Sequence, residues 1–451
     1  MDRKVIREKE KRALIVFTRE PVPGKTKTRL MPYLSPQQCA DLHMCFLRDI
    51  YREARRTDAD IMVAYEGDSY ENLSTVFGKS REYVRQSGDG LGPRMDNAIR
   101  HALDRGYEKA VLIGTDIPEL TAASIRKAFD LLDDADVVLG PTADGGYHLI
   151  GMKDVHPEAF GVKAYGNSTV LQETLKAIET SGFRAVCGDE YHDLDVREDA
   201  AGYRARMALD RRLQHSYTGR FLRDCATVSV IIPVYNESAT IAKMTEQLSP
   251  YINDAEILFV DGGSIDDTVS QIGSRFTVLT GAKGRAAQMN LGAEKSTGDI
   301  LLFLHCDSLI PPDITGEVRR CLAKNVYGCF GVRFPSRNFF MLTNRVISNH
   351  RAWKRGLPFG DQGIFMPREL FFSAGMFPEI PIMEDYEFGR RLRSAGIRPG
   401  RTRKRITTSA RRYGGNTLSI LRTEYLMWDL RRMYRRGADI QEILRRYKDI
   451  R

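Results

Sequence analysis

Long hydrophobic runs are absent from this sequence of 451 residues. Its longest apolar stretches, VSVIIPVY (228–235) and DILLFL (299–304), are far shorter than the roughly 18 residues that a membrane-spanning helix needs. The first residues, MDRKVIREKEKR, are charged throughout and have no apolar stretch of the signal-peptide type. We therefore expect a cytoplasmic protein.

Cysteine pairs are absent as well. The seven cysteines are scattered, with no C-x-x-C pair and no framework spacing, so reduced thiols are expected rather than a disulfide framework. No zinc-finger, RRM or helix-turn-helix signature accompanies the net charge of +9. A nucleic-acid-binding module is therefore disfavoured, and the charge indicates other anionic partners, such as phosphorylated substrates or an acidic membrane surface.

Two familiar phosphate-binding signatures are also missing. PVPGKTKTRL (21–30) cannot be fitted to the P-loop pattern GxxxxGK[ST], and in GDGLGP (88–93) a proline stands where GxGxxG requires its third glycine. What remains is a glycine-containing loop along which Lys25, Lys27 and Arg29 alternate. These cations are suited to binding a triphosphate or diphosphate.

The length favours two or three domains, at a prior of roughly 150 residues each. The polar, basic segment 201–227 precedes a new apolar strand at Val228. We predict a first domain over residues 1–210, a linker over 211–227 and a second domain over 228–451.

The two halves resemble each other. Each opens with an apolar strand and a proline-containing loop, and each later has a basic glycine-containing loop, a helical stretch and a strand ending in an acidic residue. Arg94 precedes Asp116 by 22 positions, and Arg285 precedes Asp307 by the same 22. We interpret this as an internal duplication, although any two α/β domains share part of the pattern.

Strands alternate with helical patterns in both halves, which predicts mostly parallel sheets with helices on both faces. In such sheets ligands bind beyond the carboxyl ends of the strands. Asp116, Asp261 and Asp307 follow strands of this kind and would project toward that edge.

Four stretches of the second half carry a family resemblance: SVIIPVYNES (229–238), ILFVDGGSIDDT (257–268), FLHCDS (303–308) and GDQGIFMPRELFFSAGMFPEIPIMEDYEFGRRL (360–392). Together they resemble a glycosyltransferase of family 2. The resemblance implies the GT-A fold, a Rossmann-like α/β architecture of nucleotide-diphospho-sugar transferases, and we expect two such domains in tandem. It also implies transfer of a sugar from a nucleotide-diphosphate donor to an acceptor hydroxyl, with inversion.

This resemblance implies roles for the motif residues. Asp307 would hold a divalent cation, Mg²⁺ or Mn²⁺, that offsets negative charge on the leaving diphosphate. His305 stands where the family's DxD motif has its first carboxylate, so it would face the ribose or act as a softer ligand. Asp385 would be the general base for the acceptor, with Glu384 before it. In the alternative interpretation, Glu384 and Asp385 simply favour a helix N-terminus.

The HCDS stretch by itself admits two other interpretations. A zinc site would need further ligands at suitable spacing, and none lies nearby in the sequence. A cysteine–histidine nucleophile is disfavoured because adjacent strand residues point to opposite faces. If Asp307 faces the cleft, His305 shares its side and Cys306 packs away.

The remaining implied roles concern the donor and the acceptor. The residues expected on the donor side are Pro233, Glu237, Asp261, Lys283 and Arg285. Asp261 would accept a hydrogen bond from the donor base, and the two cations would face the diphosphate. Asp361 and Gln362 would border the acceptor. Arg411 and Arg412 would close over the diphosphate, or form a solvated charged face.

Five stretches of the first half carry another resemblance: TREPVPGKTKTRL (18–30), GDGLGPRM (88–95), GTDIPEL (114–120), GPTADGGYHLIG (140–151) and DLDVRED (193–199). They resemble nucleotidyltransferases of the same superfold, such as the phospholactate and molybdenum-cofactor guanylyltransferases. A related group is paired with family 2 transferases and associated with arsenosugar biosynthesis. The resemblance implies transfer of a nucleotidyl group from a nucleoside triphosphate to a sugar phosphate or other phosphate, or a second sugar transfer.

The residues expected to contact the nucleotide in the first half are Lys25, Lys27, Arg29, Arg94 and Asp144. Asp116 and Asp195 would be its metal carboxylates. TADGG (142–146) taken alone also reads as a simple turn. Two further alternatives stay open for the whole chain, namely a non-catalytic nucleotide-sugar-binding protein and a protein whose main activity is N-terminal guanylyl transfer.

Apolar residues at helical spacing, with arginines between them, mark the C-terminal tail: Leu418, Leu421, Tyr425, Trp428 and Met433. Such a stripe packs against its own domain, or it lies on a membrane surface and presents a lipid-linked acceptor. In the second case the protein would be peripheral at the inner membrane face.

Overall fold

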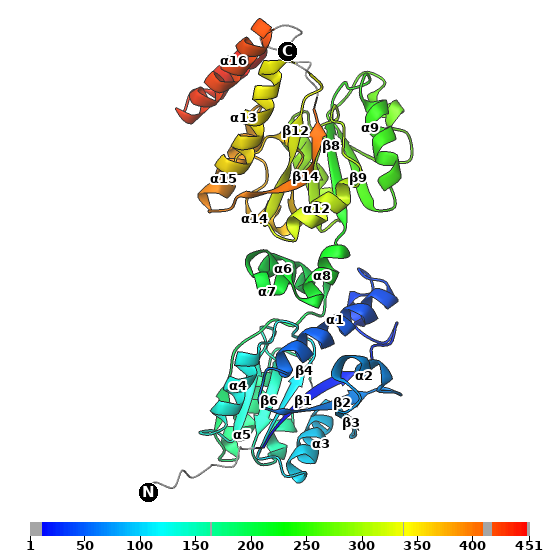
Figure 1. Ribbon diagram of the computed structural model, residues 1–451, viewed down its shortest axis with the longest axis vertical. Helices are drawn as coiled ribbons and strands as arrows, with labels where there is room; N and C mark the ends of the chain where they lie inside the picture. Colours follow the sequence, from blue (N-terminus) through cyan, green and yellow to red (C-terminus); the bar gives the residue numbers. More distant parts are fainter. Residues whose placement is uncertain (1–10, 163–164, 337, 409–416, 449–451) are drawn as a thin grey trace. The chain divides into compact units, whose positions relative to one another are not determined.

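The structure is a computed structural model that describes residues 11–162, 165–336, 338–408 and 417–448. The chain divides into two compact units (Figure 1). The first comprises the residues up to Tyr203 together with His215–Leu222, and the second comprises Arg204–Gln214 together with the residues from Arg223 onward.

The first unit is built on a sheet whose strand order, in the described part of the chain, is β3-β2-β1-β4-β6-β5-β7. β6 is antiparallel to both of its neighbours, and the other pairings are parallel. The strands are β1 (Arg12–Arg19), β2 (Asp60–Glu66), β3 (Glu82–Arg85), β4 (Lys109–Gly114), β5 (Val137–Pro141), β6 (Tyr147–Met152) and β7 (Ala185–Cys187). The helices are η1 (Thr28–Leu30), α1 (Pro36–Ala54), α2 (Glu71–Phe77), α3 (Leu91–Asp104), α4 (Ala122–Leu131), η2 (Pro157–Phe160) and α5 (Val170–Thr180).

Both faces of this sheet are buried, as is usual for parallel strands. Along β1, Leu14 and Val16 pack into one hydrophobic cluster, whereas Ala13 and Ile15 pack into a second one. Residues of α1, α2 and α4 join the first cluster, and residues of α3 and α5 join the second. The two-residue period of the strand therefore divides the core into two layers, with helices covering each face.

The second unit has a sheet of order β10-β9-β8-β11-β13-β12-β14 in the described residues, with β13 antiparallel to its neighbours. The strands are β8 (Val228–Val234), β9 (Ala255–Asp261), β10 (Thr277–Thr280), β11 (Ile300–Phe303), β12 (Tyr327–Arg333), β13 (Ile364–Pro367) and β14 (Pro399–Thr407). Its first helices are α9 (Ile241–Leu248), η3 (Ser249–Tyr251), α10 (Thr268–Ile272), α11 (Arg285–Lys295) and α12 (Ile314–Leu322). The later ones are α13 (Phe339–Arg355), η4 (Gly360–Gln362), α14 (Arg368–Ser373), α15 (Glu384–Ser394), α16 (Thr417–Arg435) and α17 (Ile440–Lys448).

The two sheets have the same strand order when their strands are counted along the chain, and in each the sixth strand is the antiparallel one. Arg94 lies in α3 and Arg285 begins α11, the helices that precede the fourth strand of each sheet. Asp116 and Asp307 both follow that fourth strand. The predicted fold class, two tandem α/β domains with mostly parallel sheets, is confirmed, and the shared topology supports a duplication.

Part of the segment assigned to a linker is folded onto the first unit. The helix before this segment is α6 (Arg197–Leu209), and the segment itself contains α7 (Arg211–Gln214) and α8 (Tyr217–Asp224). The buried carboxylate of Asp49 in α1 accepts hydrogen bonds from the backbone N–H groups of Tyr217 and Thr218, at 3.0 and 2.8 Å. An acidic group at these free N–H groups stabilises the start of α8.

Among the helices of the described residues, none combines the length and the apolar content that crossing a bilayer requires.

Close packing of α11 against the sheet provides a test of this fold. A Cβ added at Gly292 in α11 would lie 2.5 Å from Cγ2 of Ile231 in β8, whereas at Gly389 in α15 the nearest atom is 3.7 Å away. We expect Gly292→Ala to lower the free energy of unfolding by about 1 to 3 kcal/mol through overpacking. Gly389→Ala should raise it by up to about 1 kcal/mol, because alanine is the better helix former. Urea unfolding of the two variants measures this, and equal effects would contradict the predicted packing.

Candidate functional site

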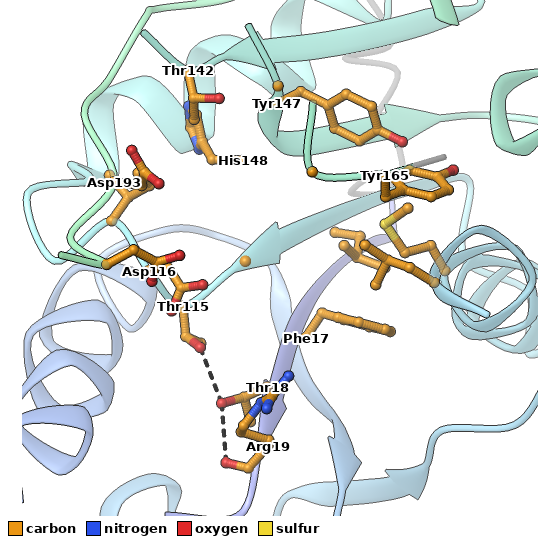
Figure 2. Close-up of a pocket in the computed structure, with 18 of the residues that line it drawn as sticks. Phe17, Thr18, Arg19, Thr115, Asp116, Thr142, Tyr147, His148, Tyr165 and Asp193 are labelled. Carbon is orange, nitrogen blue, oxygen red and sulfur yellow. Dashed lines mark hydrogen bonds between the residues drawn. The ribbon is translucent and has the colours of Figure 1, made fainter. Parts of the chain in front are cut away.

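A cavity of about 740 Å³ opens at the carboxyl edge of the first sheet. Its lining comes from the ends of strands and the loops that follow them, including Thr18, Glu66, Asp116, Thr142 and Asp195. Figure 2 shows Asp116 and Asp193 on one side of the cavity and Tyr147 and Tyr165 on the opposite side. The cavity thus has an acidic side and an aromatic side.

The side chain of Lys27 lies at the centre of the acidic side. Its ammonium Nζ is 2.5 Å from Oδ1 of Asp116, 2.7 Å from Oδ1 of Asp195 and 2.9 Å from the carbonyl oxygen of Leu194. A lysine has three N–H donors, and these three oxygens can accept all of them. Only 5% of the side chain is exposed, so the two carboxylates supply the charge compensation that its burial requires.

Burial and charge act in opposite directions on these groups. Burial lowers the pKa of Lys27, but Asp116 and Asp195 raise it, and the net pKa lies above its usual range. Burial raises the pKa of Asp116, whereas Lys27 lowers it, and the net pKa lies below its usual range. Lys27 and Asp116 are therefore both charged at neutral pH.

Lys27 also has a left-handed backbone conformation, with φ of 51°. This conformation costs a non-glycine residue roughly 1 to 2 kcal/mol. It directs the side chain into the cavity from the loop that follows β1. Such strain is often found at functional positions.

The oxygen atoms around Lys27 have the chemistry of a divalent cation site. Two carboxylates and a carbonyl are ligands that Mg²⁺ and Mn²⁺ prefer. The ammonium of Lys27 occupies the position between them, so a metal ion held by Asp116 and Asp195 would have to displace it. No group of three or more His, Cys, Asp or Glu side chains within the described residues could hold a metal on its own.

Asp193 also lines the cavity, although it was not among the predicted site residues. Burial and the neighbouring charges of Asp144, Asp195 and Asp199 raise its pKa to about 6. The signal was present in DLDVRED, where Asp193 precedes Asp195 by two positions. Its burial and the approach of Asp144 arise only in the fold, whereas Asp195 and Asp199 are its neighbours along the chain.

Asp144 lines the cavity and also forms a turn. Its Oδ1 accepts hydrogen bonds from Oγ1 of Thr142 at 2.5 Å and from the backbone N–H of Gly146 at 3.1 Å. A Cβ at Gly145 would lie 2.1 Å from the carbonyl oxygen of Ser168. The turn interpretation and the cavity position therefore hold together.

The other predicted cations differ in their surroundings. Arg94 lines the cavity and donates from Nη1 to Oε1 of Glu66 at 2.8 Å. Arg29 is largely exposed, and its Nη1 is 3.9 Å from Oδ2 of Asp195. Lys25 is exposed on the same loop.

Two buried histidines beside the cavity were not predicted either. Nε2 of His43 is 3.2 Å from Oγ1 of Thr18, which in turn is 3.1 Å from Oγ1 of Thr115 (Figure 2 shows the second contact). Burial lowers the pKa of His43 and that of His148 to about 4. Both rings are therefore neutral at neutral pH and act as hydrogen-bonding groups. A lone histidine in a sequence gives no indication of this placement.

In the second unit, two of the motif stretches, 303–308 and 360–392, meet at Gly360. The backbone N–H of Gly360 donates to Oδ2 of Asp385 at 2.6 Å. A Cβ on this glycine would lie 2.6 Å from Nε2 of His305 and 3.4 Å from Oδ2 of Asp385. His305 and Asp385 are thus neighbours in space, and a side chain at position 360 would displace the His305 ring.

The residues around HCDS alternate as predicted. Cys306 is buried in the core and lies 3.6 Å from Oγ1 of Thr240, whereas His305 and Asp307 are half-buried. Cys306 therefore belongs to the core, whereas His305 and Asp307 are partly exposed in the turn that follows β11.

Glu384 and Asp385 lie at the N-terminus of α15 but have different partners. Glu384 is buried and its Oε1 is 3.3 Å from Nη1 of Arg285. Burial and the adjacent Asp385 raise the pKa of Glu384, and Arg285 offsets part of this effect. Oδ1 of Asp385 accepts from the N–H of Tyr386 at 2.6 Å. The helix-terminus interpretation is therefore compatible with a functional one for Asp385.

The predicted donor-side residues line loops around the strand ends. The buried carboxylate of Asp261 accepts from the N–H of Gly263 and from Oγ of Ser264, at 3.0 and 2.6 Å. Oε2 of Glu237 accepts from Oγ1 of Thr240 at 2.8 Å. Pro233 is half-buried in β8. Here Asp261 and Glu237 hold loop conformation, and the Asp261 carboxylate would have to exchange partners to reach a base.

The predicted cations and acceptor-side residues also differ from one another in burial and contacts. The ammonium of Lys283 lies 3.9 Å from the centre of the Tyr235 ring. Asp361 is half-buried, but Gln362 is fully buried and its Oε1 accepts from the N–H of Phe359 at 3.1 Å. Gln362 therefore shapes the loop instead of bordering an acceptor. Arg411 and Arg412 lie outside the described residues.

Two family models match parts of the chain. Residues 50–167 match a family described as an uncharacterized protein conserved in bacteria (DUF2064), and residues 229–377 match glycosyl transferase family 2. The second match confirms the resemblance predicted from the motifs of the second half.

Individual relatives give the same result. A 2-phospho-L-lactate guanylyltransferase of Methanocaldococcus sp. is 27% identical over 214 residues, which cover 44% of this chain and 88% of that protein. An uncharacterized glycosyltransferase of Haemophilus influenzae is 27% identical over 176 residues, so the chain spans 60% of that relative's length. A crystal structure described as that of a nucleotide-diphospho-sugar transferase from Desulfovibrio desulfuricans aligns with a TM-score of 0.45 and 29% identity, over 48% of this chain and 95% of that one. The guanylyltransferase relative confirms the resemblance predicted for the first half.

Replacing Lys27 by methionine tests the cation position. The variant leaves Asp116 and Asp195 facing each other without a counter-charge. We therefore expect the free energy of unfolding to fall by roughly 1 to 3 kcal/mol. The decrease is smaller than for a fully buried pair because half of the Asp116 side chain is exposed. Mg²⁺ or Mn²⁺ should restore part of this loss by binding only the folded state. Thermal unfolding of the full chain with and without the cations measures both effects.

The exposed Lys25→Met variant on the same loop is the matched control and should change neither property. A Lys27→Met protein as stable as the wild type, or one that the cations do not stabilise further, would contradict this account of the site.

Proposed function

Because the chain joins a guanylyltransferase-like half to a family 2 glycosyl transferase half, we propose that its second unit transfers a sugar from a nucleotide-diphosphate donor to an acceptor hydroxyl, and that its first unit transfers a nucleotidyl group. The observation that carries the first part is the convergence of His305, Gly360 and Asp385, next to Glu384, which begins the helix of Asp385 and pairs with Arg285 of α11. These groups come from stretches that lie up to 100 residues apart in the sequence.

In the second unit, Asp385 is the residue best placed to act as the base. No side chain of residue 360 covers Oδ2 of Asp385, because that residue is glycine. Two backbone N–H groups hold the Asp385 carboxylate in one orientation. It would take the proton from the acceptor hydroxyl as the oxygen attacks the anomeric carbon and the nucleoside diphosphate leaves. A single displacement of this kind inverts the anomeric centre.

Charge on the leaving diphosphate requires compensation. Asp307 would hold a divalent cation, and that ion would neutralise the diphosphate as it departs. Arg285 and Lys283 would pair with the same phosphates. Glu384 holds Arg285 in place through the buried ion pair, which explains an acidic residue beside the base. His305 adjoins Asp385 and would contact the donor sugar or ribose.

In the first unit, the cavity has the volume of a nucleotide site. Asp116 and Asp195 would hold Mg²⁺ or Mn²⁺ once the phosphates draw Lys27 away from them. Lys27 and Arg94 would then pair with the triphosphate. An oxygen of the second substrate, a sugar phosphate or another phosphate, attacks the α-phosphorus, and pyrophosphate leaves. One unit would thus prepare a donor that the other consumes.

The location of the reaction is part of the proposal. Because nucleotide donors are highly charged, they would stay in the cytoplasm and the reaction would take place there. The acceptor hydroxyl would belong to a soluble molecule or to a lipid-linked one at the inner membrane face. A lipid-linked acceptor would require peripheral contact with that membrane.

Asp385→Asn tests the glycosyl transfer. The wild type is first screened with a panel of nucleotide sugars and Mg²⁺ or Mn²⁺ for release of nucleoside diphosphate. The variant should lose turnover by roughly 10²- to 10⁴-fold, because it lacks the base, yet bind the nucleoside diphosphate as before by calorimetry. Glu379→Gln, an exposed carboxylate shortly before α15, should behave as the wild type. Unchanged turnover of Asp385→Asn would refute the assignment.

A second assay addresses the first unit in the full-length protein. With nucleoside triphosphates, GTP first, and sugar 1-phosphates, we expect pyrophosphate release that Asp116→Asn abolishes. Asp307→Asn, at the corresponding place in the second unit, should leave this release intact and reduce only sugar transfer. If the wild type releases no pyrophosphate with any pair of substrates, the nucleotidyltransferase proposal fails and a second sugar transfer replaces it.

A further inference from the structure

Two helices of the second unit expose large apolar side chains. On α13 these are Phe339, Leu342, Val346 and Ile347, and 73% of Phe339 is exposed. Phe339, Leu342 and Val346 are spaced three and four residues apart, so they share one face of the helix. The opposite face, with Met341 and Asn344, is buried.

α16 likewise has one buried face and, on the opposite side, an exposed apolar face. Its buried residues are Ile420, Thr423 and Leu430. The exposed ones are Leu418, Leu421, Tyr425 and Trp428, with 80% of Leu418 exposed. These four belong to the stripe identified in the sequence, of which only Met433 packs against the core. Packing on its own unit is therefore provided by another face, and the stripe itself points outward.

The two apolar faces are joined at the N-terminal ends of their helices. Nδ2 of Asn338 donates to Oγ1 of Thr417 at 3.3 Å, and Met341 packs in one cluster with Ile420. Phe339 and Leu418 each follow one member of the hydrogen-bonded pair. Figure 1 shows α13 and α16 side by side. Phe339 and Leu418 therefore lie near each other at the joined ends, and the exposed apolar side chains of the two helices are here together called the α13–α16 face.

The charge of the two whole helices indicates the kind of partner. The exposed cations are Arg422 and Arg435 of α16 and Lys354 and Arg355 of α13. α13 carries four basic residues and no acidic one, and α16 carries four basic and two acidic residues, which gives the pair of helices a net charge of +6. A second copy of the chain would bring the same positive charge against it, which disfavours self-association. An anionic surface is complementary, and exposed Tyr425 and Trp428 are the residue types that favour a membrane interface.

We propose that the α13–α16 face docks on the surface of a bilayer that contains anionic lipids. The apolar side chains enter the interface, and arginines such as Arg422 pair with lipid headgroups. No helix needs to cross the bilayer for this.

The same helices contact the site of the second unit. Leu430 of α16 packs with Met383 and Tyr386, which flank Glu384 and Asp385. α13 ends at Arg355, shortly before Gly360 of the site. Docking would therefore bring the site to a lipid-linked acceptor. This consequence rests on the proposed sugar transfer, whereas the docking itself does not.

Vesicle sedimentation of the full-length protein tests the proposal, with phosphatidylcholine vesicles against mixed phosphatidylcholine–phosphatidylglycerol vesicles. The wild type should sediment with the anionic vesicles only. Phe339→Ser/Leu418→Ser should weaken binding by at least tenfold, because two large apolar side chains no longer leave water for the interface. Arg422→Glu should weaken it by roughly fivefold or more.

The matched controls carry the same changes elsewhere on the second unit. Ile265 is 90% exposed and Arg275 is exposed, so Ile265→Ser and Arg275→Glu should bind as the wild type does. All changed residues are at the surface, and equal unfolding temperatures verify the fold.

Three results would overturn the proposal: no sedimentation of the wild type with anionic vesicles, binding that the α13–α16 variants leave unchanged, or a dimer in analytical ultracentrifugation that Phe339→Ser/Leu418→Ser dissociates. None of these readouts depends on catalysis, so a failure of the sugar-transfer assays remains distinguishable.

Discussion

The carboxyl ends of parallel strands meet at one edge of each sheet, and the functional loops depend on this constraint. In the first unit the loops after β1, β4 and β7 bring Lys27, Asp116 and Asp195 within hydrogen-bonding distance. In the second unit the loop after β11 carries His305 toward Gly360, which precedes the antiparallel strand. Because each sheet is buried on both faces, the edge is the place where polar side chains can gather without disrupting the core.

Burial of charge is handled by a similar device in both units. A cation from the basic loop region is held by acidic side chains: Lys27 by two carboxylates, and Arg285 by Glu384. A charge transferred from water into a protein needs such compensation. In a transferase this arrangement has a further use, because the anionic phosphates of a substrate can exchange with the carboxylates as partners of the cation. In each unit a cation is therefore already held where the phosphates of the proposed nucleotide would pair with it.

The two helices that carry the exposed apolar side chains, α13 and α16, lie next to the site of the second unit. α16 packs against the residues beside Asp385. A soluble nucleotide sugar can reach the site from solution, whereas a lipid-linked acceptor stays in the plane of its bilayer. Docking would therefore bring the site to the plane in which the acceptor lies. The positive charge of the two helices would orient the protein on the anionic membrane surface.

Much of the architecture followed from the sequence alone. The alternation of apolar strands and helical patterns, the two halves with Arg94–Asp116 and Arg285–Asp307 at one spacing, and the motifs of both halves depend on local order along the chain. The alternation around Cys306 is local too, and it was predicted. The tertiary structure alone decided which side chains meet: Lys27 between Asp116 and Asp195, His305 beside Asp385, Asp193 among other carboxylates, Gln362 in the interior and the Leu418 stripe on the outside. Those outcomes depend on contacts between residues far apart in sequence, and local patterns do not encode such distances.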